Sequence, residues 1–271
     1  MIDLVKQSGL PLQWSSSLHR LVFSEIMSTP NIQPDVRRRS DLSAVLYDDQ
    51  AAAIEELYYM YRGVSLAEDE KSIENKGLRY DITVISPGTI GREYIKTAGH
   101  YHPEKKGTGI TYPEVYEVLH GRAHYLMQRP QSGHPGELGT VIFIAAKPGD
   151  KVLIPPQFGH VTINPGDDYL IMSNWVAREF TSVYDSYREL SGAAYYELRT
   201  ADGPEFIGNK RYRLLPALLR CPVTPVSRLN LITGLPLYRV FKENSDAFRF
   251  LTEPEDYADT FAGYLEELTS S

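Results

Sequence analysis

The sequence is poor in several features that would place it in a particular class of protein. It contains one cysteine, Cys221, so a disulfide within the chain is excluded. No apolar run approaches the roughly 20 residues that a membrane-spanning helix needs, and the first residues lack the charged and apolar regions of a signal peptide. Aspartate and glutamate (35) outnumber lysine and arginine (28), and this net charge of −7 argues against nucleic-acid binding. We therefore expect a cytoplasmic protein with no membrane or nucleic-acid partner.

The residues that are abundant fit a large β-rich fold. The 271 residues suffice for one large domain, or for one domain with additions, and 42% hydrophobic residues can form a substantial core. Tyrosine, with 19 residues, favours strands over helices. Against the acidic background, an anionic ligand would need local hydrogen-bond donors.

A period of two, typical of strands, begins at about residue 79. Residues 79–88 place Tyr80, Ile82 and Val84 on one face and Asp81, Thr83 and Ile85 on the other. Further strands are predicted in 91–102, in a hairpin at 113–130 bent at His120-Gly121, in strand pairs at 137–156 and 160–177, and in 193–198. Short strands separated by Gly-containing turns predict an antiparallel sandwich or barrel.

Additions are predicted at both ends of this β region. Residues 48–63 are predicted as a helix, because aspartates can cap it, alanines favour it and Gly63 can end it. After residue 200 the periodicity fades, and 244–268 are predicted as two short helices. We therefore expect an N-terminal arm and helix over 1–64, a barrel over 65–200, and a partly helical C-terminal extension over 201–271.

The histidines suggest a metal site. His100 and His102 are two residues apart, so on a strand their side chains share one face. Glu114 and His160 lie on later predicted strands, and three imidazoles with one carboxylate can bind a single zinc, iron, manganese, nickel or cobalt ion. Two histidines at this spacing are more often surface residues, and that interpretation is kept for His19, His120, His124 and His134.

The spacing of these residues resembles the two sequence signatures of the cupin superfamily. The first signature is matched by His100, Tyr101, His102, Glu114 and Gly121, and the second by Gly149, Pro155, His160 and Asn164. Two departures are a long gap between His102 and Glu114, which must loop out, and Gln157 at a position that usually holds glycine. The resemblance implies an all-β cupin fold, a double-stranded β-helix or jelly-roll barrel, with helical additions at both ends.

A narrower resemblance covers about residues 37–200. The segments RRRSDL, TVISPGTIGREYIKTAGHYH, EVYEVLHGRAHYLMQ and IPPQFGHVTINPGDD are similar, in order and spacing, to the cupin-type glucose-6-phosphate isomerase family. The resemblance implies interconversion of glucose 6-phosphate and fructose 6-phosphate with one divalent ion per chain, Fe²⁺ first and Mn²⁺, Ni²⁺ or Zn²⁺ as alternatives. Carried over residue by residue, the metal ligands are His100, His102, Glu114 and His160. The substrate contacts implied in the same way are Tyr58, Thr83, Thr97, Gly99 and Tyr116. A homodimer is also expected.

Two chemical routes for such an isomerisation stay open. One transfers the C2 proton through a cis-enediolate, with Glu114 as the candidate catalytic base, and the other is a hydride shift that needs no base. Lys96 shares strand parity with His100, so its amine can reach the predicted metal pocket and help to hold the phosphate. A position in solvent at the rim of the pocket is equally expected.

One departure from the family affects the substrate. Val176 and Ser182 replace a tyrosine and a histidine of better-known members, and Tyr184, Arg178 or a C-terminal segment is expected to substitute for them. The alternatives are a shifted sugar-phosphate substrate such as mannose 6-phosphate, a non-catalytic sugar-phosphate-binding cupin, and another cupin metalloenzyme such as an Fe(II) oxygenase.

Overall fold

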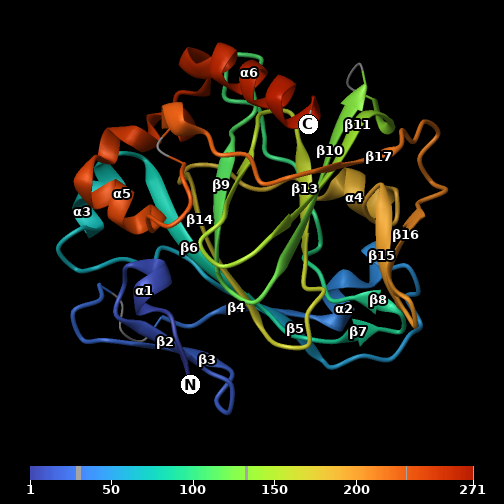
Figure 1. Cartoon of the computed structure of the whole chain (residues 1–271), viewed down its shortest axis with the longest axis horizontal. Coiled ribbons are helices and arrows are strands. Elements are labelled where there is room, and N and C mark those ends of the chain that lie inside the picture. Colours follow the sequence, from blue (N-terminus) through green and yellow to red (C-terminus); the bar gives the residue numbers. More distant parts are fainter. Residues whose placement is uncertain (29–31, 132–133, 230, 271) are drawn as a thin grey trace.

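Two β-sheets on opposite sides of a barrel form the body of the molecule in this computed structural model, which describes residues 1–28, 32–131, 134–229 and 231–270 (Figure 1). The six-stranded sheet has the order β12 (Lys151–Ile154), β9 (Glu114–His120), β14 (Leu170–Ala177), β6 (Leu78–Ile85), β5 (Glu56–Tyr61) and β4 (Asp35–Arg38). The four-stranded sheet has the order β13 (Gly159–Ile163), β10 (Ala123–Gln131), β11 (His134–Ala146) and β17 (Leu218–Cys221).

The connections between these sheets follow a jelly-roll. From β9 to β14 the chain passes between the two sheets at every turn except the one that joins β10 to β11. The expected cupin-type barrel is therefore confirmed. The hairpin predicted at 113–130 is wrong in its pairing, because β9 pairs with β12 and β14 while β10 pairs with β11 and β13. At the bend Gly121 has φ of +80°, and a side chain there would lie 2.5 Å from the Tyr169 carbonyl oxygen.

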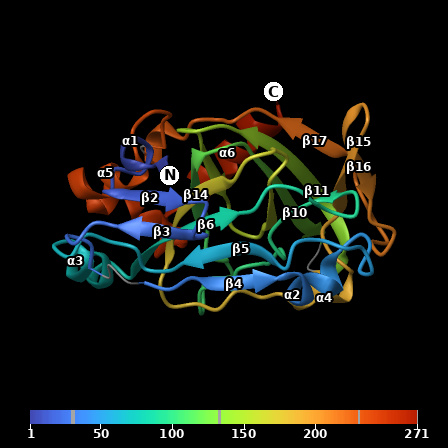
Figure 2. The ribbon, with the colours of Figure 1, turned by 90° about the horizontal axis from the view of Figure 1, so that it is seen from below.

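The helix predicted over residues 48–63 is wrong. Its second half is strand β5, which lies between β4 and β6 (Figure 2). The sequence ELYYMY places tyrosines in a buried strand, where their preference for a pleated sheet outweighs the helical preference of the preceding alanines. The N-terminal 64 residues thus contribute two strands to the larger sheet.

Short elements surround the barrel near its N-terminal strands. A small sheet contains β1 (Ile2–Asp3), β2 (Leu12–Ser15) and β3 (Arg20–Phe23), and the helices here are α1 (Val5–Ser8), α2 (Arg39–Leu42), η1 (Ser43–Val45) and α3 (Glu70–Asn75). A further sheet contains β7 (Thr89–Ile90), β8 (Glu93–Tyr94), β15 (Tyr195–Thr200) and β16 (Gly203–Gly208), with α4 (Asp185–Glu189) before it. The single strand expected over 91–102 is only β8 followed by isolated bridges.

The C-terminal region covers the outside of the barrel (Figure 1). It contains α5 (Leu237–Glu243), η2 (Ser227–Leu229), η3 (Ser245–Leu251), η4 (Pro254–Tyr257) and α6 (Ala258–Thr269). Trp175 of β14 packs against Phe241 and Phe248, with ring centroids 4.8 and 5.3 Å away. In the described part of the chain no helix combines the length and the hydrophobicity needed to cross a membrane.

Candidate metal centre

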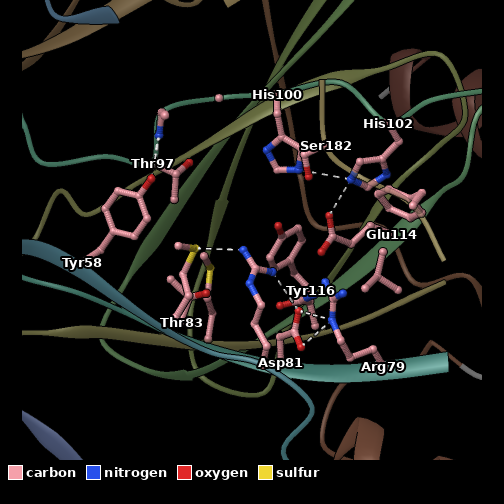
Figure 3. Close-up of a pocket in the computed structure, with 18 of the residues that line it drawn as sticks. Tyr58, Arg79, Asp81, Thr83, Thr97, His100, His102, Glu114, Tyr116 and Ser182 are labelled. Carbon is pink, nitrogen blue, oxygen red and sulfur yellow. Dashed lines mark hydrogen bonds and ion pairs between the residues drawn. The ribbon is translucent and has the colours of Figure 1, made fainter. Parts of the chain in front are cut away.

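Four side chains from different parts of the barrel come together, and three of them, His100, His102 and Glu114, line one cavity (Figure 3). Glu114 is the first residue of β9, and His160 lies on β13 of the opposite sheet. His100 forms an antiparallel bridge with His160, and the side chain of His102, two residues later, reaches the same point. One potential ligand atom from each of these four residues lies within 4.8 Å of the other three. The structure therefore brings together the four residues predicted as ligands.

The distances within this cluster fit a bound cation. His102 Nε2 lies 3.2 Å from both His100 Nε2 and Glu114 Oε2, and His160 Nε2 lies 3.3 Å from Glu114 Oε2. Two ligands about 2.1 Å from one ion, at angles between those of an octahedron and a tetrahedron, are roughly 3.0–3.4 Å apart. Glu114 Oε2 is buried with no hydrogen-bond partner in the described part of the chain. Its surroundings suit coordination to a metal.

The protonation states also suit a cation. Burial lowers the pKa of His100, and the neighbouring histidines lower it further. Burial likewise lowers the pKa of His160, although Glu114 opposes this shift. Burial alone would raise the pKa of Glu114, but the adjacent His102 and His160 side chains outweigh it and the net shift is downward. Neutral imidazoles and an ionised carboxylate are the forms that bind a metal.

Neighbouring groups hold the potential ligands in place. His102 Nδ1 lies 2.9 Å from the Tyr112 carbonyl oxygen, to which it donates a hydrogen bond, and this directs Nε2 toward the cluster. The His102 ring also packs on Phe180, with centroids 4.5 Å apart. Tyr116, on the same face of β9 as Glu114, places its hydroxyl 3.0 Å from His160 Nε2. Burial keeps the pKa of Tyr116 well above its usual value, so the phenol stays protonated.

The residues predicted to contact substrate line the same cavity, mostly away from the metal ligands (Figure 3). The Tyr58 hydroxyl accepts a hydrogen bond from the Ala98 main-chain N–H at 3.3 Å, and the Thr97 hydroxyl accepts one from Thr162 N at 3.0 Å. Gly99 has φ of +81°, and a side chain there would lie 2.5 Å from the Tyr187 ring. The main chain can therefore turn beside the cavity only because this residue is glycine.

The sequence interpretation missed three charged residues in the cavity, Arg62, Arg79 and Asp81. The buried Asp81 carboxylate accepts hydrogen bonds from Gly63 N at 2.9 Å and from Arg79 Nε at 2.9 Å, and Arg62 lies 3.4 Å away. Burial raises the pKa of Asp81 even though both arginines oppose the shift. Strand parity could have identified Asp81, because it shares a face of β6 with Thr83.

Lys96 lies in neither of its two expected positions. Its side chain is buried outside the metal cavity, where Nζ lies 3.2 Å from Glu93 Oε1 and donates to the Val45 carbonyl at 2.6 Å. Arg178, a suggested substitute for the missing family contacts, pairs with Glu74 at 3.0 Å and does not line the cavity.

Three further positions discussed from the sequence do line the metal cavity. Val176 and Ser182 are in its wall, as is Tyr184, whose ring centroid lies 5.5 Å from that of His100. Of the two side chains suggested as substitutes, only Tyr184 lines the cavity.

The long gap before Glu114 forms a loop, as predicted, and stabilises the turn at Gln157. Gln157 adopts φ of +70°, which a glycine would adopt more easily. Its main-chain N–H donates to Thr111 Oγ1 at 2.6 Å and its side chain donates to the Gly109 carbonyl at 2.9 Å. At the other end of the loop Lys105 forms an ion pair with Glu255 of the C-terminal region.

The remaining histidines lie outside the cluster. His19 and His120 contact Tyr59 and Asp168 at 3.0 and 2.9 Å, and His134 is exposed. His124 departs from the surface interpretation, because it is largely buried and lies 2.7 Å from the buried Glu197 carboxylate.

Comparison with known proteins identifies relatives over this region. A family model described as glucose-6-phosphate isomerase (GPI) matches residues 36–210. A Thermococcus litoralis protein named glucose-6-phosphate isomerase is 34% identical over 143 residues, which cover 51% of this chain and 66% of that protein. A Pyrococcus abyssi protein of the same name is 31% identical over 147 residues, covering 52% and 69% of the two chains. Among solved structures, a mutant of Bacillus subtilis oxalate decarboxylase has a TM-score of 0.34 at 18% identity, over 50% of this chain and 30% of that one.

Proposed function

Because this chain belongs to the glucose-6-phosphate isomerase (GPI) family, which its match over residues 36–210 establishes, we propose that it is a metal-dependent isomerase of glucose 6-phosphate and fructose 6-phosphate. The observation that carries this proposal is the cluster of His100, His102, Glu114 and His160, whose first three members line a cavity that also contains uncharged hydrogen-bond donors.

The four clustered residues would hold one divalent cation. We propose Fe²⁺ first, with Mn²⁺, Ni²⁺ and Zn²⁺ as alternatives, since nitrogen and carboxylate ligands accept all four. When bound, such an ion supplies Lewis acidity toward the carbonyl and hydroxyl oxygens of a sugar.

Glu114 is the proposed proton-transferring group between C1 and C2, on the route through a cis-enediolate. Its carboxylate is ionised, because its pKa is lowered, and it is the only carboxylate of the cluster. A base must lie within hydrogen-bond reach of the proton that it accepts, and Glu114 would meet this condition for a sugar bound through its first two oxygens at the cluster. Tyr116 remains a protonated phenol 3.0 Å from His160 Nε2, and we propose that it donates to a substrate oxygen.

The phosphate would be bound at the other end of the cavity. Tyr58, Thr83, Thr97 and Gly99 line this end, and their hydroxyls and main-chain N–H provide donors without net charge. The Asp81 carboxylate of the same cavity is paired with Arg62 and Arg79. This polar lining favours a sugar phosphate over the apolar substrate of an oxygenase. A homodimer in the cytoplasm remains part of the proposal, and light scattering after size-exclusion chromatography tests the dimer.

The direct test is a coupled isomerase assay on chelated protein reloaded with each of the four metals. We expect turnover to disappear on chelation and to return with at least one metal. Full activity in the metal-free protein would overturn the metal dependence, and binding of glucose 6-phosphate without turnover would identify the chain as a non-catalytic sugar-phosphate-binding protein.

A further inference from the structure

A second cavity adjoins the metal cavity and is rich in positive charge. The two cavities share Ala98, Gly99 and Tyr184 in their walls. The second cavity is completed by Arg37, Asp41, Val45 and Arg188. Its one carboxylate, Asp41, accepts a hydrogen bond from the Arg38 main-chain N–H at 2.8 Å.

Arg37 is held beside the proposed phosphate contacts by strand pairing. On β4 it lies directly opposite Tyr58 of β5. Burial raises the pKa of the Tyr58 hydroxyl to about 12, and Arg37 is close enough to oppose this rise. Its side chain is half-buried, and among the described residues no carboxylate forms an ion pair with it. The next residue, Arg38, lies instead on the outer face and contacts Glu56 at 3.6 Å.

Arg188 approaches the same cavity from α4. Its guanidinium lies over the Tyr184 ring, 5.4 Å from the centroid, and it is 4.0 Å from the Asp185 carboxylate. Its side chain is 60% exposed, so solvent weakens any charge contact that it makes. Tyr184, in turn, packs against His100, so this tyrosine connects the metal cluster to the second cavity.

Uncharged donors lie where the two cavities join. The Gly99 main-chain N–H has no hydrogen-bond partner in the described part of the structure. The positive φ of Gly99, in a space too small for a side chain, sets the direction of this N–H. The half-buried Arg37 guanidinium has no carboxylate partner and lies next to this donor. Such a pair suits an oxyanion with more than one negative charge.

We propose that Arg37 binds the substrate's phosphate and supplies the positive charge that Tyr58, Thr83, Thr97 and Gly99 lack, with Arg188 as a weaker, more exposed contact. The identity of the ligand as a sugar phosphate rests on the proposed function above. The chain as a whole carries a charge of −7, and the two arginines of the metal cavity, Arg62 and Arg79, are paired with Asp81, so a cation without such a partner makes this point attractive to a phosphate.

The test compares Arg37→Gln with its neighbour Arg38→Gln. Because a hydrogen bond to a charged group is worth about 1.5–3 kcal/mol, we expect R37Q to raise KM for glucose 6-phosphate and the inhibition constant of inorganic phosphate by roughly 10- to 100-fold. We expect kcat to change by less than about 3-fold, since the phosphate does not react. R188Q should have a smaller effect, R37K should recover part of the loss, and R38Q should match the native protein.

Titration calorimetry with glucose 6-phosphate and with glucose separates this inference from the proposed isomerase activity. If the native metal-loaded protein binds glucose 6-phosphate without turning it over, the isomerase proposal fails while the affinity ratio of the two sugars still tests Arg37. That ratio should fall by roughly 10- to 100-fold in R37Q and stay constant in R38Q. An unchanged ratio in folded R37Q, or an equal loss in R38Q, would overturn the role of Arg37.

Discussion

At the scale of single residues, Glu114 combines two properties that rarely occur together. It is buried and ionised, and it faces two imidazoles that cannot fully satisfy its oxygen Oε2 by hydrogen bonding. A buried charge without complete partners is unfavourable for folding, so this arrangement indicates a position kept for chemistry.

Replacing Glu114 with glutamine tests this interpretation. Glu114→Gln keeps the size of the side chain but removes the charge, so we expect kcat to fall by about 10²- to 10⁴-fold, the usual contribution of a general base. The coupled assay should be paired with a measurement of metal content. His134→Ala, at an exposed residue away from the cluster, is the matched control and should retain activity.

Gly99 gives a second prediction at this scale, on stability. Gly99→Ala would force a side chain into a left-handed conformation and into contact with Tyr187 and Val161, so we expect the free energy of unfolding to fall by about 1–3 kcal/mol. Urea denaturation measures this change. Gly107→Ala shares the positive φ but meets no atom within 4 Å of its new carbon, so it isolates the conformational part of the loss.

At the scale of elements, β9 connects the site to the C-terminal helices. On this strand Glu117 is buried, lies 3.0 Å from Lys151 Nζ of β12 and accepts a hydrogen bond from Leu237 N, the first residue of α5, at 2.7 Å. The start of α5 is thus fixed to the sheet by one carboxylate.

The pH dependence of stability should reveal this carboxylate. Burial raises the pKa of Glu117 to about 7, against the opposing effects of Lys151 and Leu237 N–H. The folded chain therefore keeps a proton that the unfolded chain loses near pH 4.5, and the stability this provides is lost as the pH rises through about 7. Unfolding in urea at pH 5 to 8 should show this decline in the native protein and a weaker one in Glu117→Gln. Parallel curves for the two proteins would contradict the assignment.

The sequence predicted the barrel and the metal cluster because both depend on local patterns. Alternation along β6 and the spacing of His100 and His102 are visible without knowledge of tertiary contacts. The strand over Glu56–Tyr61 was mistaken for a helix, because its alanine-rich approach resembles one and its partners β4 and β6 are distant in sequence. Arg37 lies in the RRRSDL segment that resembled the family, but its position opposite Tyr58 depends on that same strand pairing and was not predicted.

At the scale of the whole molecule, the metal cluster joins two sheets, since Glu114 belongs to one and His160 to the other. A cation that binds only the folded chain stabilises it in proportion to the logarithm of its concentration over Kd. We expect a saturating metal to raise Tm of chelated protein by about 5 °C or more, measured by calorimetry. His160→Ala should lose most of this increase, and an equal increase in the variant would place the stabilising metal elsewhere.

The ion pair between Lys105 and Glu255 has a consequence for how distant changes reach the metal. The loop that contains Lys105 also contains Tyr112, whose carbonyl accepts the hydrogen bond from His102 Nδ1. The C-terminal region and a proposed metal ligand therefore contact the same short segment. Loss of this ion pair would loosen the support of His102, so we expect an ion held by the proposed ligands to dissociate faster before the fold itself is destabilised.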